Sequence, residues 1–526
     1  PLSIDSFEEI IEDNYIYVDK TKEIWKIIEK RKKYHFLSRP RRFGKSLLIS
    51  TMKELFLGNE KLFKNLYIHD KWDWNKLYPV LHFDMSKNDS TSPENLEKSI
   101  IHSIEKIAKK KQINIDKEIS LKDKFIDLIE GIYESAGEKL VVLVDEYDKP
   151  ILDYVDNLKI ANENREVLKS FYTILKSSGQ YIHFVFITGV SKFSQTSIFS
   201  GLNTLKDLSL NERYSTICGY TQDELINYFD EFIAKFAKNA NMTKVDLIKE
   251  IEINYDGYSW DGDNFLYNPY SILSALDDEL IFNYWFESGT PTFLLKLIQK
   301  ENYIKSLIKP VKVKSNIFKK FEIENLDKIN LTTILMQTGY LTIKNIKKSK
   351  GKILEYTLDI PNKEVHDSIF EELITLYTNQ SIEKISNLGT ELLKSIKNCD
   401  NENFNKDMKI LLSKISYFDH KKDESFYHAI FLSFMSLLGF HVQGEILTNI
   451  GRIDVVLLHE NIALICEIKY DENKSFNKVI TAAMNQIIEK KYYEPYMDKK
   501  VILLALVFGD RTVQGELKPF DKESFL

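Results

Sequence analysis

Short apolar runs alternate with amphipathic stretches along the first third of the chain. The runs have the length of buried strands, and the stretches between them repeat apolar residues at helical spacing. We predict strands at 34–38, 80–85, 139–144 and 182–187. We predict helices at 47–56, 93–110, 122–135 and 161–178. Such strand–helix alternation, with right-handed crossovers, predicts an α/β domain built on a parallel sheet.

The pattern becomes mainly helical after residue 220 and returns to strands near the C-terminus. Helices are predicted at 221–236, 243–254, 269–278 and 331–339, and two strands at 340–346 and 353–358 flank a turn at 347–351. Residues 380–415 read as polar helices that connect two domains. The last hundred residues predict a helix at 421–438, strands at 440–447, 452–458 and 462–469, a further helix, and a closing strand at 501–508.

Composition bounds the class of protein. The 526 residues are 43% hydrophobic and 29% charged, which suits about three folded domains. A net charge of -6 excludes a basic coat of the histone type, but it leaves room for a local basic surface. The longest apolar run has eight residues, the start lacks a signal-peptide pattern, and the three cysteines are scattered. We expect a cytoplasmic protein without a membrane segment or a disulfide framework.

A tight loop follows the first predicted strand and leads into a helix. It reads Arg39-Pro-Arg-Arg-Phe-Gly44-Lys45-Ser46. In phosphate-binding loops a glycine admits phosphate close to the backbone, the lysine reaches the β- and γ-phosphates, and the hydroxyl holds Mg²⁺. Arg39 stands where the first glycine of such a loop is usual, and its arginines could contact phosphate or a neighbouring acid. The alternative is a chance Gly-Lys-Ser in an ordinary loop.

A second motif favours the phosphate-binding interpretation. The strand at 139–144 ends in Asp145 and Glu146, and parallel sheets bind ligands at this edge. Asp145 would hold Mg²⁺ through water, and Glu146 would activate the attacking water. An extra strand between the two motif strands is typical of ATPases with a catalytic glutamate. At the tip of the fourth strand, Thr188 or Ser191 could sense the γ-phosphate. The predicted nucleotide-binding residues are Arg42, Phe43, Gly44, Lys45, Ser46, Leu47, Asp145 and Thr188, with Ser46 and Asp145 as metal ligands.

Seven motifs in order along residues 1–300 carry a family resemblance. They lie at 17–21 (YVDKT), 39–46, 144–150 (VDEYDKP), 217–221 (ICGYT), 255–258 (YDGY), 267–271 (YNPYS) and 284–293. Together they resemble the bacterial AAA-ATPase-like family, whose pattern includes an arginine in place of the first loop glycine. The resemblance implies ATP binding and hydrolysis, and a C-terminal nuclease-like domain.

Two further features of the middle of the chain allow two interpretations each. Arg213 could be a charge-neutralising finger, although a surface arginine is the favoured interpretation. The acids of residues 255–263 could suggest Ca²⁺, but a polar turn is favoured because the distal glutamate of an EF-hand loop is missing.

Residues 305–352 are the basic part of the chain, with twelve lysines and three acids. The predicted helix, strand, basic turn and strand form a winged-helix pattern. Lysine without arginine favours unspecific phosphate contact over base readout. A solvated hairpin tip is the equal alternative.

Acidic and basic residues recur on the C-terminal strands. Glu467 and Lys469 lie two residues apart on one predicted strand, so their side chains share a face of the sheet. A hairpin between this strand and the preceding one could bring Asp454 close to them. Two carboxylates can bind a divalent metal and a lysine can activate water. This arrangement resembles the PD-(D/E)XK nuclease superfamily, in which Glu424 and Gln486 match supporting positions. A plain alternating strand with a surface pair is the alternative for Glu467 and Lys469.

We therefore predict a P-loop parallel-sheet ATPase with a helical lid, a winged-helix-like middle and a C-terminal α/β restriction-endonuclease-like domain. The predicted regions are 1–220 (ATPase core), 221–300 (lid), 301–380 (basic middle), 381–418 (connector) and 419–526 (nuclease-like domain).

The predicted function is ATP binding and hydrolysis coupled to a metal-dependent nuclease that acts on DNA. Mg²⁺ serves both sites, Mn²⁺ is an option at the nuclease, and a homo-oligomer is left open. The predicted catalytic residues are Glu146, Glu467, Lys469 and Gln486, and the predicted metal ligands of the nuclease are Glu424, Asp454 and Glu467. The alternative is a non-catalytic, nucleotide-switched regulator whose C-terminal domain only binds nucleic acid or protein.

Overall fold

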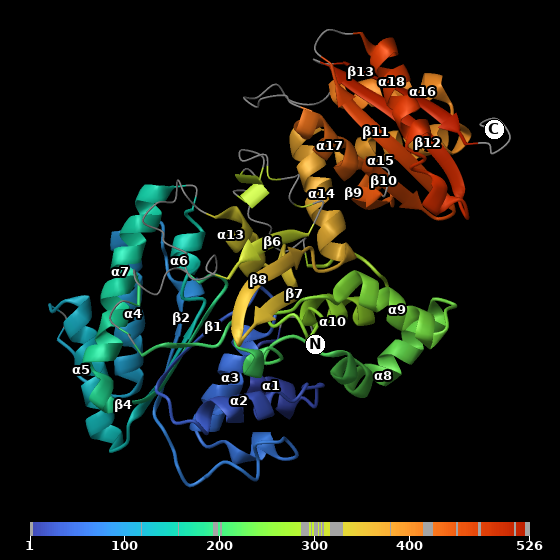
Figure 1. Cartoon of the computed structure of the whole chain (residues 1–526). Helices are drawn as coiled ribbons and strands as arrows, with labels where there is room; N and C mark the ends of the chain where they lie inside the picture. The colour runs from blue at the N-terminus through green and yellow to red at the C-terminus, as the bar shows by residue number, and fades with distance from the viewer. Residues whose placement is uncertain are drawn as a thin grey trace. The chain divides into compact units, whose positions relative to one another are not determined.

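The computed structural model divides into two compact units, which are described separately (Figure 1). Unit 1 comprises Pro1–Gly289 and Lys312–Glu364, and unit 2 comprises Thr290–Val311 and Val365–Leu526. The structure describes residues 4–116, 118–155, 157–192, 204–285, 310–315, 330–378, 380–413, 424–448, 451–471, 475–509 and 512–520, with a few single residues between 198 and 307. Side chains at 382, 413, 424–426, 429, 441–448 and 451–454 lie outside the described set.

A parallel five-stranded sheet organises the first part of unit 1. Its strands are β1 (Tyr34–Ser38), β2 (Val80–Asp84), β3 (Leu140–Asp145), β4 (Ile182–Gly189) and the two-residue β5 (Lys206–Asp207), in the order β2-β3-β4-β1-β5. The four predicted strands are confirmed. In space it is β4 that separates the two motif strands, whereas β2, which lies between them in the chain, is at the edge. Because all four pairings are parallel, the carboxyl ends of β1, β3 and β4 meet at one edge.

Helices pack against the sheet and bury its central strands. They are α1 (Phe7–Glu12), α2 (Thr21–Ile28), α3 (Lys45–Phe56), α4 (Pro93–Lys110), α5 (Leu121–Ala136), α6 (Lys149–Leu152) and α7 (Leu158–Ser177). Phe125 of α5 and Phe171 of α7 stack at 4.6 Å and meet Phe83 of β2. Phe56 of α3 packs on Phe184 of β4. Every residue of β3 is buried, as a parallel strand between two helical layers requires.

The helical lid is confirmed as α8 (Gln222–Asn239), α9 (Lys244–Tyr255) and α10 (Pro269–Asp278). Thr221 and Glu224 form the predicted capping box at the start of α8. Glu224 also pairs with Lys20 at 2.7 Å, which ties the N-terminal segment to the lid. Short 3₁₀ helices lie at η1 (Glu60–Phe63), η2 (Met85–Lys87), η3 (Gly179–Tyr181), η4 (Glu212–Tyr214) and η8 (Glu494–Tyr496).

The basic middle contributes a helix and a hairpin to unit 1. They are α13 (Leu331–Thr338), β7 (Thr342–Ser349) and β8 (Lys352–Asp359), and β6 (Val311–Lys314) joins them in a sheet of order β6-β8-β7. The predicted turn at 347–351 is too long, because β7 continues to Ser349. The reversal is left to Lys350 and Gly351, which both have positive φ, 47° and 72°. Glycine tolerates this conformation without strain.

Two hairpin lysines are used inside the fold. Lys344 donates to the carbonyl oxygen of Pro361 at 2.8 Å, and burial lowers its pKa. Lys348 pairs with Glu212 of η4. Lys347, Lys350 and Lys352 are exposed. The acidic segment before the hairpin is a turn: Asp261 is buried and accepts from the backbone of Asp263 and Asn264.

A buried carboxylate, Glu364, fixes the start of α14 (Lys363–Thr378) in unit 1. It accepts from the backbone N–H of Trp285 and from the Ser271 hydroxyl, both at 2.8 Å, and it is fully buried. Burial raises the pKa of Glu364 to about 7. The folded state therefore binds the proton more tightly than the unfolded chain, so stability that is present below pH 4.5 is lost as the pH rises through 7.

Replacing Glu364 with glutamine should remove this pH dependence. The amide oxygen can accept from Trp285, and the amide nitrogen can donate to Ser271. We expect E364Q to stabilise unit 1 by about 3 kcal/mol relative to wild type at pH 8.5 but not at pH 4.5. All five tryptophans lie in unit 1, so tryptophan fluorescence during urea unfolding reports it alone. A difference between the two proteins that does not change with pH would contradict this.

Unit 2 carries a mixed five-stranded sheet. The strands β9 (His441–Thr448), β10 (Gly451–His459), β11 (Ile462–Tyr470), β12 (Lys500–Gly509) and β13 (Thr512–Pro519) run in the order β13-β12-β11-β10-β9. Only the β11–β12 pairing is parallel. The strand predicted at 501–508 is confirmed as β12, but it does not end the sheet as predicted, because β13 pairs with it along its length. The helices are α15 (Ile382–Asn398), α16 (Asn401–Ser413), α17 (Glu424–Leu437) and α18 (Phe476–Glu489).

The core of unit 2 joins this sheet to α18. Ile480 and Ile487 of the helix pack with Ile465 of β11 and Leu503 of β12. In both units, none of the helices among the described residues has the length and apolarity needed to cross a membrane.

Candidate nucleotide site and candidate nuclease site

The predicted phosphate-binding loop connects β1 to α3. Gly44 is the N-cap of α3 and has φ 86°, a left-handed conformation that favours glycine. Lys45, Ser46 and Leu47 form the first turn, whose free N–H groups face the loop. The side chain of Phe43 is fully buried and packs edge-on against Tyr258 at 4.8 Å. Phe43 therefore offers a ligand its backbone rather than its ring.

The two motifs meet at the shared edge of the sheet. Lys45 is 3% exposed, and its Nζ donates to the Pro40 carbonyl at 3.0 Å and lies 3.6 Å from Glu146 Oε1. Asp145 Oδ1 accepts from the Thr188 hydroxyl at 2.5 Å and from the Glu146 N–H at 3.0 Å. Glu146 has φ 51°, a strained conformation that is common at functional sites. The structure thus brings together a lysine, two acids and a hydroxyl from three strand ends.

The two candidate sensor hydroxyls have different partners. Thr188 bonds Asp145, whereas Ser191 donates its backbone N–H and its hydroxyl to Asp148 at 2.6 and 2.5 Å. Asp148 is fully buried, and burial, followed by the charge of Glu146, raises its pKa to about 6. Ser191 therefore anchors the end of β4, and Thr188 is the hydroxyl at the acidic pair.

The three loop arginines also separate. Arg39 is buried; its guanidinium donates to the carbonyl oxygens of Ser209 and Tyr214 and lies 4.0 Å from the centre of the Trp260 ring. Burial lowers its pKa to about 10. Arg41 approaches Asp153 at 3.9 Å, and Arg42 stacks on a tyrosine of the lid. Arg39 thus supports the loop through hydrogen bonds to buried carbonyl oxygens, and its guanidinium does not face a ligand.

Restoring the usual glycine at position 39 should therefore weaken the protein. Arg39→Gly removes a cation held by buried carbonyl oxygens and leaves those oxygens without their donors. We expect a loss of at least about 3 kcal/mol in the stability of unit 1. Urea unfolding followed by tryptophan fluorescence measures the loss, and exposed Arg31→Gly serves as the control. Wild-type stability with altered ATP affinity would show that Arg39 faces the ligand.

A cavity of about 720 Å³ opens beside the phosphate-binding loop. Its phosphate end is formed by Arg42 to Leu48 and Glu146, and its far walls come from segments that the sequence reasoning left without a role. The apolar and aromatic part of these walls includes Ile16, Tyr17, Val18, Ile217, Tyr220, Phe229, Phe232, Tyr270, Leu273 and Leu276. Three of the quoted motifs, at 17–21, 217–221 and 267–271, contribute to them. These motifs could have indicated the walls of the cavity, but only the fold shows that they lie around the same space.

The residues of this cavity fit a nucleoside triphosphate with Mg²⁺. Its volume suits a ligand of that size, and its walls away from the loop offer a nucleobase apolar and aromatic side chains, together with the polar side chains of Asp5, Asn14, Lys20 and Asp277. Arg42 lies 3.7 Å from the centre of the Tyr270 ring, and its buried Nη1 lacks a hydrogen-bond partner within the described part of the chain. An anionic ligand would satisfy that donor. Arg213 lines a different cavity, so within one chain it does not border this one.

The candidate nuclease residues meet on β11. Glu467 is fully buried, and its Oε1 accepts from Lys469 Nζ at 2.6 Å and from Gln486 Nε2 at 2.5 Å. The side chain of Lys469 is 33% exposed, so this group reaches solvent. Strand alternation explains why Glu467 and Lys469 share a face, and α18 supplies Gln486 from above that face. Glu467 therefore contacts two other predicted residues, Lys469 and Gln486.

The other two predicted metal ligands are placed by their backbone alone. Val455 of β10 pairs with Cys466 of β11, and continuing that register sets Asp454 beside Glu467. Glu424 begins α17, one turn before Tyr427, which stacks on Tyr470 at the end of β11. The side chains of Asp454 and Glu424 lie outside the described residues. Among the residues that the structure describes, no group of three or more His, Cys, Asp or Glu converges on one point.

Together, the parallel sheet with its phosphate-binding loop and the mixed sheet with its Glu-x-Lys strand define an ATPase-like domain joined to a nuclease-like domain. The family model described as predicted AAA-ATPase matches residues 1–199, and the PD-(D/E)XK nuclease superfamily model matches residues 422–516. The chain is 34% identical, over 525 residues and 98% of each chain, to a protein of Azotobacter chroococcum mcd 1 described as an uncharacterized protein in the vnfD 5' region. The chain therefore belongs to the AAA-ATPase-like family with a C-terminal PD-(D/E)XK domain, as the motifs predicted.

Among solved structures, the crystal structure of Cdc6p from Pyrobaculum aerophilum aligns with 67% of this chain and 93% of its own at 12% identity and a TM-score of 0.24. A similarity this low carries no argument about function.

Proposed function

We propose that the protein hydrolyses ATP in the cavity beside the phosphate-binding loop and couples this to metal-dependent cleavage of DNA by unit 2. One observation supports the first half most strongly. Lys45 and Glu146 line one end of the cavity of about 720 Å³, and Asp145, which precedes Glu146 and accepts from its N–H, holds the Thr188 hydroxyl next to them.

In the proposed ATPase, each residue has a defined task. Lys45 exchanges the Pro40 carbonyl and Glu146 for the β- and γ-phosphates, which frees the Glu146 carboxylate to accept a proton from the attacking water. Arg42, braced on the lid, adds charge on the phosphate side. Ser46 and Asp145 would hold Mg²⁺, and that ion neutralises charge on the phosphates when bound.

In the proposed nuclease, Lys469 and Glu467 act at a phosphodiester. Glu467, with Asp454 and Glu424, would hold Mg²⁺ or Mn²⁺, an ion that supplies Lewis-acid stabilisation of the phosphate. Lys469 orients the attacking water or takes its proton, and Gln486 fixes the orientation of the Glu467 carboxylate. The hydrogen bond from Gln486 supports this arrangement because it would hold Glu467 in place even when Lys469 turns towards a substrate.

The experiment that tests the whole proposal is incubation of the purified full chain with plasmid and with single-stranded DNA. Each substrate is supplied with ATP and with Mg²⁺ or Mn²⁺, and both phosphate release and strand cleavage are followed. Metal-dependent cleavage is the expected result. Phosphate release without cleavage under any condition would favour the nucleotide-switched regulator.

A further inference from the structure

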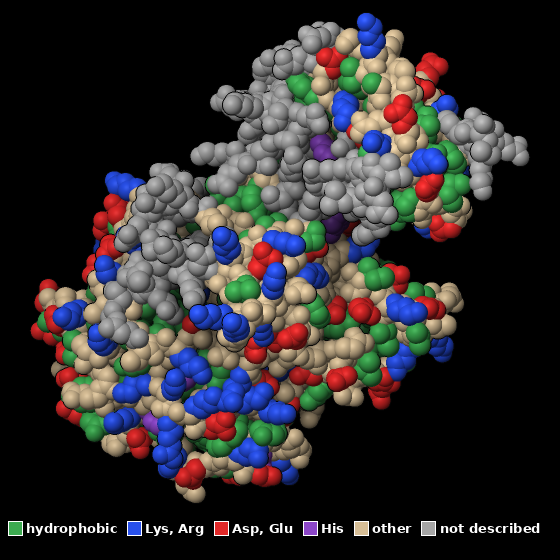
Figure 2. Space-filling model, in the orientation of Figure 1, with side chains coloured by type: hydrophobic (Ala, Val, Ile, Leu, Met, Phe, Trp, Pro, Cys, Tyr) green, Lys and Arg blue, Asp and Glu red, His purple; other side chains and the backbone are tan. Residues whose placement is uncertain are grey.

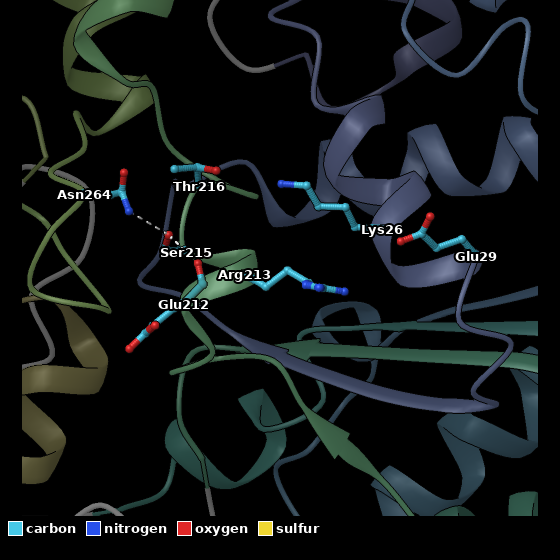
Figure 3. Close-up of a pocket in the computed structure, with 7 residues that line it drawn as sticks. All are labelled: Lys26, Glu29, Glu212, Arg213, Ser215, Thr216 and Asn264. Atoms are coloured by element: carbon cyan, nitrogen blue, oxygen red, sulfur yellow. Dashed lines mark hydrogen bonds between the residues drawn. The ribbon is translucent and has the colours of Figure 1, made fainter. Parts of the chain in front are cut away.

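Besides the nucleotide cavity, unit 1 has a second cavity, of about 630 Å³, between α2 and η4 (Figure 3). Two cations and two acids are part of its lining: Lys26, Arg213, Glu29 and Glu212. Figure 2 shows basic and acidic side chains together on the surface around α2. The second cavity therefore offers a ligand no net charge. The wall of the nucleotide cavity, in contrast, includes the start of α10 in the lid.

An arginine–tyrosine contact links the phosphate-binding loop to the lid. The guanidinium of Arg42 lies 3.7 Å from the centre of the Tyr270 ring, and both residues line the nucleotide cavity. The buried Nη1 of Arg42 has no hydrogen-bond partner among the described residues. Phosphate in the cavity would attract this guanidinium and thereby change its stacking on the ring. Nucleotide binding is therefore expected to act on Tyr270, the second residue of α10.

The N-cap of α10 holds Tyr270 and Ser271 in one turn. Asn268 is fully buried, and its Oδ1 accepts from the backbone N–H of Tyr270 at 2.9 Å and from that of Ser271 at 3.3 Å. A displacement of Tyr270 is therefore shared with Ser271. The Ser271 hydroxyl, also buried, donates to Oε2 of Glu364 at 2.8 Å. The lid helix that borders the nucleotide cavity thus contacts Glu364.

Glu364 joins two of the quoted motifs at a buried point. Its Oε1 accepts from the backbone N–H of Trp285 at 2.8 Å, so the motifs at 267–271 and 284–293 meet at this carboxyl group. Among the described residues its hydrogen-bond donors are neutral, and burying a carboxyl group without a cation costs more than burying an apolar side chain. Structural support alone would favour an apolar residue here. The carboxyl group therefore indicates that its hydrogen bonds have a function beyond stability.

The helix that Glu364 helps to begin continues from unit 1 into unit 2. α14 belongs to unit 1 through Glu364 and to unit 2 from Val365. Because a helix backbone is hydrogen-bonded along its length, a displacement of its first turn is passed to the next turn. In unit 2, Nε2 of His366 shares a hydrogen bond of 2.7 Å with the Ser436 hydroxyl of α17. A change at Glu364 is therefore passed along α14 to α17.

α17 connects this hydrogen bond to the candidate nuclease site. The helix begins at Glu424, a predicted metal ligand, and its Tyr427 stacks on Tyr470 at the end of β11 with ring centres 5.7 Å apart. β11 carries Glu467 and Lys469. Contacts thus run from the phosphate-binding loop to the start of α14 in unit 1, and from α14 to the candidate nuclease strand in unit 2.

We propose that Glu364 transmits nucleotide binding in unit 1 to the candidate nuclease site of unit 2. Nucleotide alters the contact between Arg42 and Tyr270, the first turn of α10 moves Ser271, and Glu364 passes this movement to α14 and α17. Glu364 is a positioning residue, since it does not line the nucleotide cavity. The proposal rests on the proposed function, for which it supplies the route of coupling. Coupling is a free energy shared by two sites, so a break along the route should lower it.

The test is amide hydrogen exchange of the full chain with and without AMP-PNP and Mg²⁺, a nucleotide that binds without turnover. In wild type, AMP-PNP should change the exchange of α14 and α17. Ser271→Ala removes the bond to Glu364 and should reduce both changes at least about threefold, while AMP-PNP affinity, measured by titration, stays the same. The matched control is Ser274→Ala. Ser274 is buried on the same helix, but Glu364 accepts from Ser271, so this variant should respond as wild type does.

Two further variants test the order of the route. Ser436→Ala breaks the bond to His366, so α14 should respond to AMP-PNP as in wild type while the response of α17 falls. Glu364→Gln keeps a hydrogen bond to Ser271 and to Trp285 and should keep both responses. A merely structural role for these residues would not produce this order. A wild-type response of α17 in Ser436→Ala would overturn the route, even if Ser271→Ala failed to fold.

The remaining outcomes separate this proposal from the proposed function. Equal responses of Ser271→Ala and Ser274→Ala would overturn the route. Binding of AMP-PNP by wild type without a change in α14 or α17 would also overturn it, and would leave ATP hydrolysis and DNA cleavage standing. The expected exchange pattern without DNA cleavage would contradict the nuclease and support the route. Failure of wild type to bind AMP-PNP would remove the route together with the proposed ATPase.

Discussion

Replacing Lys45 with alanine is expected to abolish ATP binding. Lys45 is almost fully buried, and its ammonium is held between the Pro40 carbonyl and Glu146, at the end of the cavity where phosphates would lie. Losing two charge-assisted hydrogen bonds to phosphate should weaken ATP affinity at least about 100-fold. Isothermal titration with ATP measures this. Lys53→Ala is the matched control, since Lys53 lies on the same helix and pairs with its neighbour Glu54 instead of facing the cavity.

Glu146→Gln separates binding from turnover at the same site. The amide keeps the shape of the side chain but does not take a proton from water, so ATP binding should persist while hydrolysis falls by about 10² to 10⁴-fold. Phosphate release under saturating ATP measures the fall. Unchanged hydrolysis in both the Lys45 and the Glu146 variants would exclude this cavity as the ATPase site.

Replacing Lys469 with alanine is expected to stop DNA cleavage and to leave ATP hydrolysis intact. Gln486 still donates to Glu467 in this variant, so the buried carboxylate keeps a donor and the fold should survive. Loss of a residue that positions or activates water should lower cleavage by about 10² to 10⁴-fold. Plasmid nicking with Mg²⁺ and Mn²⁺ measures the loss, and basal phosphate release checks that the rest of the chain is native.

The matched control for this variant is Lys478→Ala. Lys478 is exposed on α18, the same helix that carries Gln486. It should cleave DNA as wild type does. If Lys469→Ala cuts as fast as Lys478→Ala, then Lys469 is a surface partner of Glu467 and the superfamily's chemistry does not apply to this chain.

Periodicity and motif order predicted most of the fold because both signals are local. Four parallel strands, the lid helices and the Glu-x-Lys strand lie where the apolar pattern placed them. What the pattern missed is short or strongly polar. β5 has two residues, and β13 alternates polar and apolar residues at the edge of its sheet, where one face carries little burial signal. The length of the hairpin was also missed, since charged β7 reads as a turn.

The candidate sites were predictable as residue types but not as a set of partners. A strand ending in two acids predicts metal and base chemistry. The sequence did not show which hydroxyl lies beside these acids: Ser191 is hydrogen-bonded to Asp148, so Thr188 is the one that bonds Asp145. The lysine-rich middle looked uniform, although Lys344 and Lys348 are committed to a carbonyl and to Glu212. These contacts cannot be predicted from the local sequence, because the partners come from distant parts of the chain.

The sequence by itself determined which motifs this protein carries: a loop of the phosphate-binding type, an acid pair after a buried strand, and a Glu-x-Lys strand near the C-terminus. These motifs can be recognised without knowing the fold, because each is defined by the spacing of residues along one loop or one strand. Only the tertiary structure decided that Arg39 supports the loop through buried carbonyl oxygens, that three separate motifs line one cavity, and that Arg213 lines a different one. A side chain's role depends on what surrounds it, and its surroundings are set by packing between segments that the sequence keeps far apart.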